Sequence, residues 1–124
     1  EVARDWTRLL PVGAAAILGD AAHPTLPFLA QGASMGLEDA WVLAEALARH
    51  DTVAAALLAY QTARKPRCTR IVGAANANAR AYHLKGLPRV VGHTGLRILG
   101  RMAPAAMLNR FDWLYGHDIT QAGV

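Results

Sequence analysis

The stretch Gly19-Asp20-Ala21-Ala22-His23-Pro24 decides how this chain is interpreted, because it joins an apolar strand pattern to a loop that carries one carboxylate. The apolar residues 14–18 before it are few enough for a buried strand, and Gly19-Asp20 ends the pattern. In open α/β sheets, ligands bind beyond the carboxyl ends of the strands. We therefore expect Asp20 at a ligand-facing edge, where its carboxylate can accept hydrogen bonds from sugar or polyol hydroxyls.

Residues 21–32 are predicted to form an ordered apolar loop. Pro24 and Pro27 lie within it, and proline lacks the N–H donor that a helix or an inner strand needs. At the end of the loop, the free N–H groups of residues 32–35 open a helix and can stabilise a negative ligand atom. Alternatively, the same glycines and aspartate only connect a strand to a helix, and the residues by themselves favour neither interpretation.

The first helix is predicted to begin at Ser34, a good N-cap residue, and to end near His50-Asp51. Its helical period places one set of apolar residues on a common face. This predicted packing face consists of Leu37, Trp41, Ala44, Leu47 and Ala48.

A second helix is predicted to be capped by Asp51 or Thr52 and to kink or end at Pro66. Helical pattern resumes over residues 69–83. Glycines and a proline weaken any helix over residues 87–108. The expected fold is therefore mostly α, with one or two short strands.

Length and composition narrow the class of protein. The chain has 124 residues, which is enough for one small domain, and its 53% hydrophobic content is too high for disorder. It has no run of about 20 apolar residues, so no membrane span is expected. Its single cysteine cannot form an internal disulfide and it shows no secretory signal, so a cytoplasmic location is expected.

Charge is distributed unevenly, because every charged residue between Thr52 and Phe111 is basic. Within this region, Arg89, His93, Arg97 and Arg101 recur every four residues and could form a cationic stripe. A non-catalytic basic helical interaction module is therefore one alternative function. A solvated or internally paired face is the simpler explanation. Aromatic side chains that could stack on bases are sparse here, which argues against nucleic acid as a partner.

The block from Gly19 to Ala40 resembles the second FAD-binding motif of the flavoprotein aromatic hydroxylases. These are FAD-dependent monooxygenases with the para-hydroxybenzoate hydroxylase fold, an α/β FAD/NAD(P)-binding fold. Their pattern Gly-Asp-Ala-Ala-His, Pro, Gly or Ala-Gln-Gly, Gly and Asp-Ala is matched here with its spacing intact. Further similarities cover nearly the whole chain: Trp6, the helical set Tyr60, Arg64 and Arg67, and residues 111–118, which resemble the closing segment of the salicylate hydroxylase-like branch.

The resemblance implies an FAD site. Asp20 would hold the ribityl chain, and the N–H groups at the helix start would face the N1–C2=O edge of the flavin, where the reduced cofactor is negatively charged. Pro27, Phe28 and Leu29 would shield the side where a flavin C4a-hydroperoxide forms. The implied cofactor-binding residues are Gly19, Asp20, Pro27, Gly32, Ala33, Ser34 and Met35. The resemblance implies no catalytic residue and no metal ligand in this chain.

By the same resemblance, residues 1–83 would be the C-terminal part of an FAD-binding domain and residues 84–124 a helical extension. The parent enzyme would use NADH or NADPH and O2 to hydroxylate a phenolic or benzoate-type substrate. The chain lacks a Gly-x-Gly-x-x-Gly motif for the adenine dinucleotide. We therefore expect a fragment, inactive alone, whose partner is the missing N-terminal FAD-binding portion. Exposed apolar surface could also drive homo-oligomerisation.

Two other chemical interpretations are weaker. Gly32-Ala33-Ser34-Met35-Gly36 fits the Gly-x-Ser-x-Gly nucleophile elbow of α/β-hydrolases, but that elbow needs a strand running into the serine. His23 could be a base or a metal ligand, yet only Asp20 lies near it at a suitable spacing. A structural histidine bonded within its loop is favoured. Tyr60, Arg64 and Arg67 are expected to form ion pairs on a helix surface or contacts between domains, and not to be catalytic.

Overall fold

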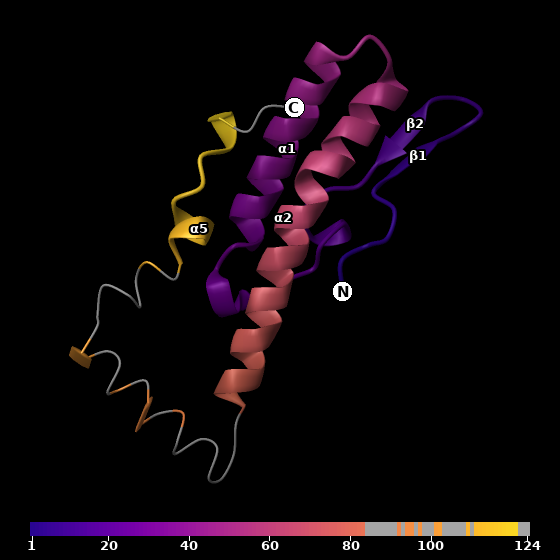
Figure 1. Cartoon of the computed structure of the whole chain (residues 1–124). Helices are drawn as coiled ribbons and strands as arrows, with labels where there is room; N and C mark the ends of the chain where they lie inside the picture. Colours follow the sequence, from indigo (N-terminus) through magenta and orange to yellow (C-terminus); the bar gives the residue numbers. More distant parts are fainter. Residues whose placement is uncertain are drawn as a thin grey trace.

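The computed structural model describes residues 1–83 and 111–121, and between them only positions 92, 94, 95, 97, 101, 102 and 109. Two long helices, α1 (Gly32–Arg49) and α2 (Val53–Tyr82), lie side by side (Figure 1). They are antiparallel, because residues 50–52 alone connect them. A hairpin of two short strands lies beside the first half of α2. The described part is thus mostly helical with one small sheet, as predicted.

The strands β1 (Thr7–Leu9) and β2 (Ala14–Ala16) pair antiparallel, with Thr7 opposite Ala16. The prediction of a buried strand over residues 14–18 was wrong in two respects. The strand is shorter, and its first two residues are exposed. The reason is that β1 is its only strand partner within the described residues, and a two-stranded ribbon leaves most of its surface open.

Helix α1 begins two residues before the predicted N-cap. Gln31 occupies the N-cap position without a capping side-chain hydrogen bond, and Ser34 lies inside the first turn. The helix ends at Arg49, with His50 as its C-cap, as the sequence predicted. The N-terminus of α1 therefore has no capping side chain.

The buried face of α1 is not the predicted one. Met35, Asp39, Val42 and Ala46 are buried against the rest of the protein. The predicted packing face (Leu37, Trp41, Ala44, Leu47 and Ala48) is exposed instead. Helix α1 has apolar residues on two sides, and α2 covers the side that also carries a buried carboxylate.

Helix α2 does not end at Pro66 but continues through it to Tyr82. Pro66 cannot donate a hydrogen bond to the carbonyl of Thr62. Both residues are exposed, so water can satisfy that carbonyl. At the start of the helix, Thr52 Oγ1 accepts a hydrogen bond from the Ala55 N–H at 3.2 Å, which agrees with the predicted cap. The predicted weak helix over residues 87–108 lies largely outside the described residues.

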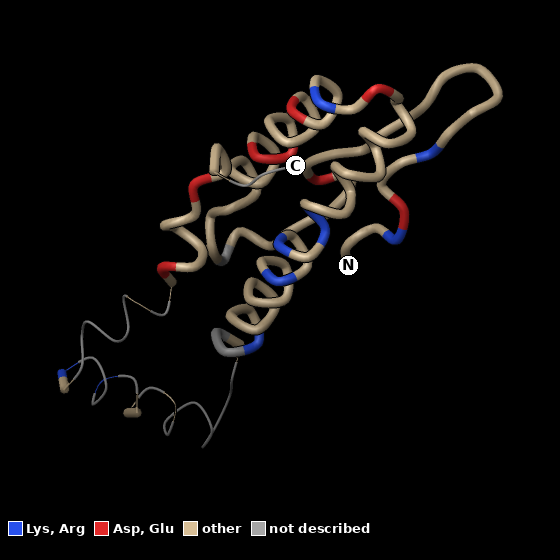
Figure 2. The backbone as a smooth tube through the Cα atoms, turned by 45° about the horizontal axis from the view of Figure 1, so that its top comes forward, with Lys and Arg blue, Asp and Glu red and all other residues tan. Residues whose placement is uncertain are grey.

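Charge separates between the two helices. Most of the charged positions of α1 are acidic, whereas the charged positions of α2 are all basic (Figure 2). Of the predicted cationic stripe, Arg89 and His93 lie outside the described residues. No helix in the described part of the chain is long and apolar enough to cross a membrane.

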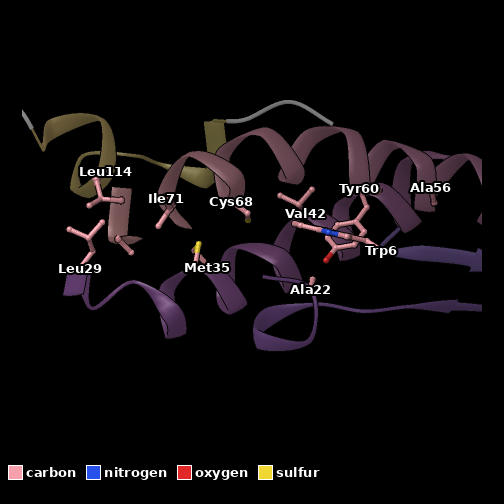
Figure 3. Close-up of a cluster of buried hydrophobic side chains, with 12 residues drawn as sticks. Trp6, Ala22, Leu29, Met35, Val42, Ala56, Tyr60, Cys68, Ile71 and Leu114 are labelled. Carbon is pink, nitrogen blue, oxygen red and sulfur yellow. The ribbon is translucent and has the colours of Figure 1, made fainter. Parts of the chain in front are cut away.

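The hydrophobic core lies between α1, α2 and the loops at their ends (Figure 3). Trp6 is 1% exposed, and its backbone N–H donates a hydrogen bond to Gln61 Oε1 at 2.8 Å. The hydroxyl of Tyr60 donates to the carbonyl of Ile17 at 3.0 Å. Both contacts attach the N-terminal hairpin to α2, because Trp6 and Ile17 flank the two strands.

The C-terminal segment returns to the two-helix unit through α5 (Asp112–Tyr115), which is followed by η3 (Ile119–Gln121). The guanidinium of Arg70 lies over the Trp113 ring, 3.8 Å from its centroid. The hydroxyl of Tyr115 donates to the carbonyl of Leu29 at 3.2 Å. Figure 3 shows Leu114 beside Leu29 at one end of the core.

Removing one methyl group from the core tests this packing. Ile71 is fully buried, and we expect Ile71→Val to lower the free energy of unfolding by about 1 kcal/mol, measured by urea denaturation. Leu58 on the same helix is 62% exposed, so Leu58→Ala should change the free energy of unfolding by less than about 0.5 kcal/mol. Equal losses for the two variants would contradict the described packing of α2.

Candidate functional site

The predicted ligand carboxylate lies on a short 3-10 turn, η1 (Gly19–Ala21), which follows β2. Gly19 has φ +58°, a left-handed conformation that glycine adopts without steric cost. Asp20 is exposed, and a Cβ placed on Gly32 would lie 3.9 Å from its Oδ1. The structure therefore brings Asp20 and the start of α1 together, with Gly32 directly beside the carboxylate.

The first turn of α1 presents unpaired donors. Among the described residues, none accepts a hydrogen bond from the backbone N–H of Gly32, Ala33 or Ser34. Ala33 and Ser34 are exposed. The N–H of Met35, which the sequence analysis grouped with them, donates to the Gln31 carbonyl at 2.9 Å, and the Met35 side chain is buried. Three N–H groups of the predicted set thus have no acceptor among the described residues, and they lie at the positive end of the helix dipole.

A second 3-10 turn, η2 (Pro27–Leu29), precedes this helix start. Pro27 is exposed and Leu29 is buried, whereas the side chain of Phe28 lies outside the described part. Ala30 ends the turn with φ 50°, a left-handed conformation that favours glycine. A glycine at this position would adopt the same conformation without the steric cost that Ala30 bears.

A buried carboxylate, Asp39, holds these pieces in place. Its Oδ2 accepts a hydrogen bond from the Gly19 N–H at 2.9 Å and contacts His23 Nε2 at 2.5 Å. Its Oδ1 accepts from Arg64 Nε at 2.8 Å. Asp39, His23 and Arg64 are all at most 1% exposed. One side chain therefore connects the turn that carries Asp20, helix α1 and helix α2.

The neighbouring Glu38 extends this network toward the C-terminus. It pairs with Arg64 Nη1 at 2.7 Å and with two nitrogens of Arg67 at 2.9 and 3.0 Å. Arg67 also donates to the carbonyls of Trp113 and Leu114 at 3.1 and 3.2 Å. The prediction of ion pairs is confirmed for Arg64 and Arg67, but Arg64 and Tyr60 are both buried rather than on the helix surface.

The network shifts the pKa values of its members. Burial by itself favours the neutral imidazole of His23, whose Nδ1 has no hydrogen-bond partner among the described residues. Against this effect of burial, the hydrogen bond to Asp39, the interactions with Cys68 and the charge of Asp39 together raise the pKa of His23 to about 10. Burial raises the pKa of Asp39, but the hydrogen bonds from His23, Arg64 and the Gly19 N–H, together with the charge of His23, lower it by more, so the pKa of Asp39 is below its usual value. His23 is therefore a charged partner of Asp39 and not a free base.

His23, Asp39 and Cys68 also place one potential metal-ligand atom each within 4.8 Å of one another. The guanidinium of Arg64 already occupies this cluster: it binds Asp39 Oδ1 and lies 3.6 Å from Cys68 Sγ. A metal ion would have to displace a buried positive charge, so the arrangement favours an ion-pair centre over a metal site. Sequence spacing missed this cluster, because its members come from a loop and two different helices.

Two other expectations from the sequence concern His23 and Ser34. The side-chain partner of His23 is on α1, not within its own loop as expected. Ser34 follows the 3-10 turn η2 and the left-handed Ala30 instead of a strand. The nucleophile elbow of an α/β-hydrolase is therefore not present at this serine.

Comparison with known proteins identifies related sequences. The FAD binding domain family matches residues 2–75. 3-Amino-4-hydroxybenzoate 2-monooxygenase PtnB3 of Streptomyces platensis is 36% identical over 97% of this chain and 29% of its own length. 3-Hydroxybenzoate 6-hydroxylase 2 of Aquipseudomonas alcaligenes is 41% identical, over 92% and 34% respectively. Salicylate hydroxylase of Pseudomonas putida is 37% identical, over 86% and 24%. The chain thus spans about a third or less of these relatives.

Removing the charge of Asp39 tests the network. We expect Asp39→Asn to lower the free energy of unfolding by about 3–5 kcal/mol, because it leaves His23 and Arg64 buried without their shared counter-charge. Urea denaturation followed by circular dichroism measures this loss. The exposed Asp20 is the matched control, and Asp20→Asn should change the free energy of unfolding by less than about 0.5 kcal/mol. If Asp39→Asn lowers the free energy of unfolding by less than about 1 kcal/mol, the buried charges are not coupled.

The raised pKa of His23 predicts a pH dependence of stability. The imidazole has a pKa of about 6.5 in the unfolded chain, and about 10 in the folded protein. The folded state therefore binds the proton more tightly, so its stabilisation is complete below about pH 6.5 and is lost as the pH rises toward 10. We expect the free energy of unfolding to fall by up to about 1.4 kcal/mol per pH unit across this window.

Equilibrium unfolding at a series of pH values measures this slope. In the variant His23→Asn, which cannot be protonated there, the decline over the same window should disappear. A decline of equal steepness in the variant would assign the pH dependence to another group.

Proposed function

Because the chain belongs to the FAD binding domain family, we propose that it supplies the flavin-facing part of an FAD-dependent monooxygenase that hydroxylates an aromatic ring. The observation that carries this proposal is the position of the Asp20 carboxylate beside the open N-terminus of α1. A carboxylate and a row of unpaired N–H groups suit a ligand that offers hydroxyl groups at one place and an electron-rich edge at the next.

The chemical types of the residues at this site suit FAD. The exposed Asp20, which lies beside Gly32, would accept hydrogen bonds from the ribityl hydroxyls. The N–H groups of residues 32–34 and the helix dipole stabilise negative charge at the N1–C2=O edge. The exposed Pro27 helps to exclude water from the flavin. Bound FAD supplies the redox chemistry that activates O2, whereas these residues bind and orient it.

The names of the relatives support a substrate class. They are hydroxylases or monooxygenases of hydroxybenzoate, aminohydroxybenzoate and salicylate. We propose a phenolic benzoate-type acid as the substrate, NADH or NADPH as the reductant, and a cytoplasmic location. Catalysis requires polypeptide beyond these residues, since the chain has no Gly-x-Gly-x-x-Gly motif for the adenine dinucleotide and matches a third or less of each relative.

Flavin retention in a chimaera tests the proposal. The chimaera is 3-hydroxybenzoate 6-hydroxylase 2 with its matched segment replaced by this chain, and bound flavin is measured by visible absorbance after gel filtration. We expect Asp20→Ala to weaken FAD binding about tenfold or more, because it removes the acceptor for the ribityl hydroxyls.

Asp51 is the matched control, since it is an exposed aspartate at the other end of α1. Asp51→Ala should leave flavin retention unchanged. If the two variants retain flavin equally, Asp20 does not contact the cofactor and the proposed site is wrong.

A further inference from the structure

The turn that precedes the proposed flavin site contains a strained residue. Ala30, which ends η2, has φ 50°, a conformation that is costly for any residue with a Cβ. Its backbone N–H donates a hydrogen bond to the Pro27 carbonyl at 3.2 Å. Helix α1 begins two residues later, at Gly32. The conformation of Ala30 therefore sets the direction in which the chain enters the first turn of α1.

The peptide unit between Leu29 and Ala30 is hydrogen-bonded on both sides. Its N–H donates to Pro27, and its carbonyl accepts a hydrogen bond from the hydroxyl of Tyr115 at 3.2 Å. Rotation of this planar unit by half a turn would change the ψ of Leu29 and the φ of Ala30 together, and would move Ala30 out of the left-handed region. Because such a rotation breaks both hydrogen bonds, Tyr115 opposes the relaxation that the strain at Ala30 favours.

Helix α5 holds the hydroxyl of Tyr115 in place. Arg67 of α2 donates hydrogen bonds to the carbonyls of Trp113 and Leu114. Leu114 is 2% exposed and lies beside Leu29 in the core (Figure 3). Tyr115 itself is 61% exposed, so its ring contributes little to the core, and its hydroxyl connects it with η2. The donor therefore belongs to a segment that α2 fixes independently of the turn.

We propose that Tyr115 is a positioning residue for the flavin site. It keeps the Leu29–Ala30 peptide in the orientation that directs the first N–H groups of α1 toward the N1–C2=O edge of the flavin. The inference rests on the proposed function, because that function places the flavin at the start of α1. In this role Tyr115 acts through the backbone of η2 and needs no contact with the cofactor.

Hydrogen exchange tests the effect of Tyr115 on the peptide unit. Exchange of the Ala30 N–H is measured in the chimaera described above, by mass spectrometry that resolves single residues. Tyr115→Phe keeps the ring and removes only the hydroxyl. We expect the Ala30 N–H to exchange about fivefold faster in this variant, which is the effect of losing one hydrogen bond that opposes local opening. An unchanged exchange rate would overturn the inference.

Flavin affinity tests the consequence for the site. FAD is titrated into the chimaera after its cofactor has been removed, and binding is followed by flavin fluorescence. We expect Tyr115→Phe to weaken FAD binding about threefold or more, because the turn is less often in the conformation that binds the cofactor.

A second substitution distinguishes positioning from a merely structural role. Glycine adopts a positive φ without steric cost, so adding Ala30→Gly to Tyr115→Phe should restore FAD affinity and slow the exchange at position 30. A general loss of packing at α5 would not be rescued by a change in η2. No loss of affinity in Tyr115→Phe, or a loss that Ala30→Gly does not restore, would therefore overturn the inference.

Thr52→Ala is the matched control. It also removes a hydroxyl that is hydrogen-bonded to the backbone, since Thr52 Oγ1 accepts from the Ala55 N–H at 3.2 Å, but at the opposite end of α1. We expect this variant to bind FAD as the unsubstituted chimaera does. Equal weakening by Thr52→Ala and Tyr115→Phe would assign the effect to lower overall stability and overturn the positioning role.

Asp20→Ala separates this inference from the proposed function. If it weakens FAD binding and Tyr115→Phe does not, the flavin site is supported and the role of Tyr115 is overturned. If only Tyr115→Phe weakens binding, with rescue by Ala30→Gly, the role of Tyr115 is supported and the contact of Asp20 with FAD is contradicted. If the unsubstituted chimaera binds no FAD, the proposed function and the positioning of a flavin are both contradicted, and exchange at Ala30 then shows only whether Tyr115 holds the turn.

Discussion

The pairing of Asp39 with His23 and Arg64 is the interaction on which the rest of the structure depends. Burial of three ionisable groups is costly unless each finds a partner, and the full set of pairs forms only when the loop after β2, helix α1 and helix α2 are all in place. Apolar contacts alone would tolerate sliding between the helices. The ion pairs tolerate much less, because a displaced Arg64 would lose its pairing with Asp39 and leave a buried guanidinium away from that carboxylate. The network therefore fixes the relative position of the two helices and of Asp20.

The same network links the proposed cofactor edge to the end of the chain. Glu38 pairs with both Arg64 and Arg67, and Arg67 donates hydrogen bonds to two carbonyls of α5. The hydroxyl of Tyr115 in α5 donates a hydrogen bond to the carbonyl of Leu29, in the turn before α1. The basic charge of α2, which was part of the case for a basic interaction module, thus partly serves internal pairing. What remains open to a ligand is the other side of the loop, where Asp20 and the first N–H groups of α1 lie.

Much of the fold was predictable from local signals. The end of α1 near His50 and the cap at Thr52 follow from short-range preferences, and the motif from Gly19 to Ala40 identified the family. The packing face of α1 was not predictable. The helical period places apolar residues on both sides of this helix, and it gives no indication of which side α2 covers. Helix α2 passes through Pro66 because the orphaned carbonyl is at the surface, which only the structure reveals. Asp39 and Arg64 are 25 positions apart, and no spacing rule joins residues of different helices.

The hydrogen bond from Tyr115 to Leu29 spans 86 positions of the chain, whereas α1 and α2 are joined by residues 50–52 alone. During synthesis from the N-terminus, the helical pair can therefore assemble while the C-terminal segment is still being made. The turn before α1 acquires its last anchor only after residue 115 has emerged, and closing so long a loop carries an additional entropic cost. The order of translation thus makes the side of the site near Leu29 the last to become rigid.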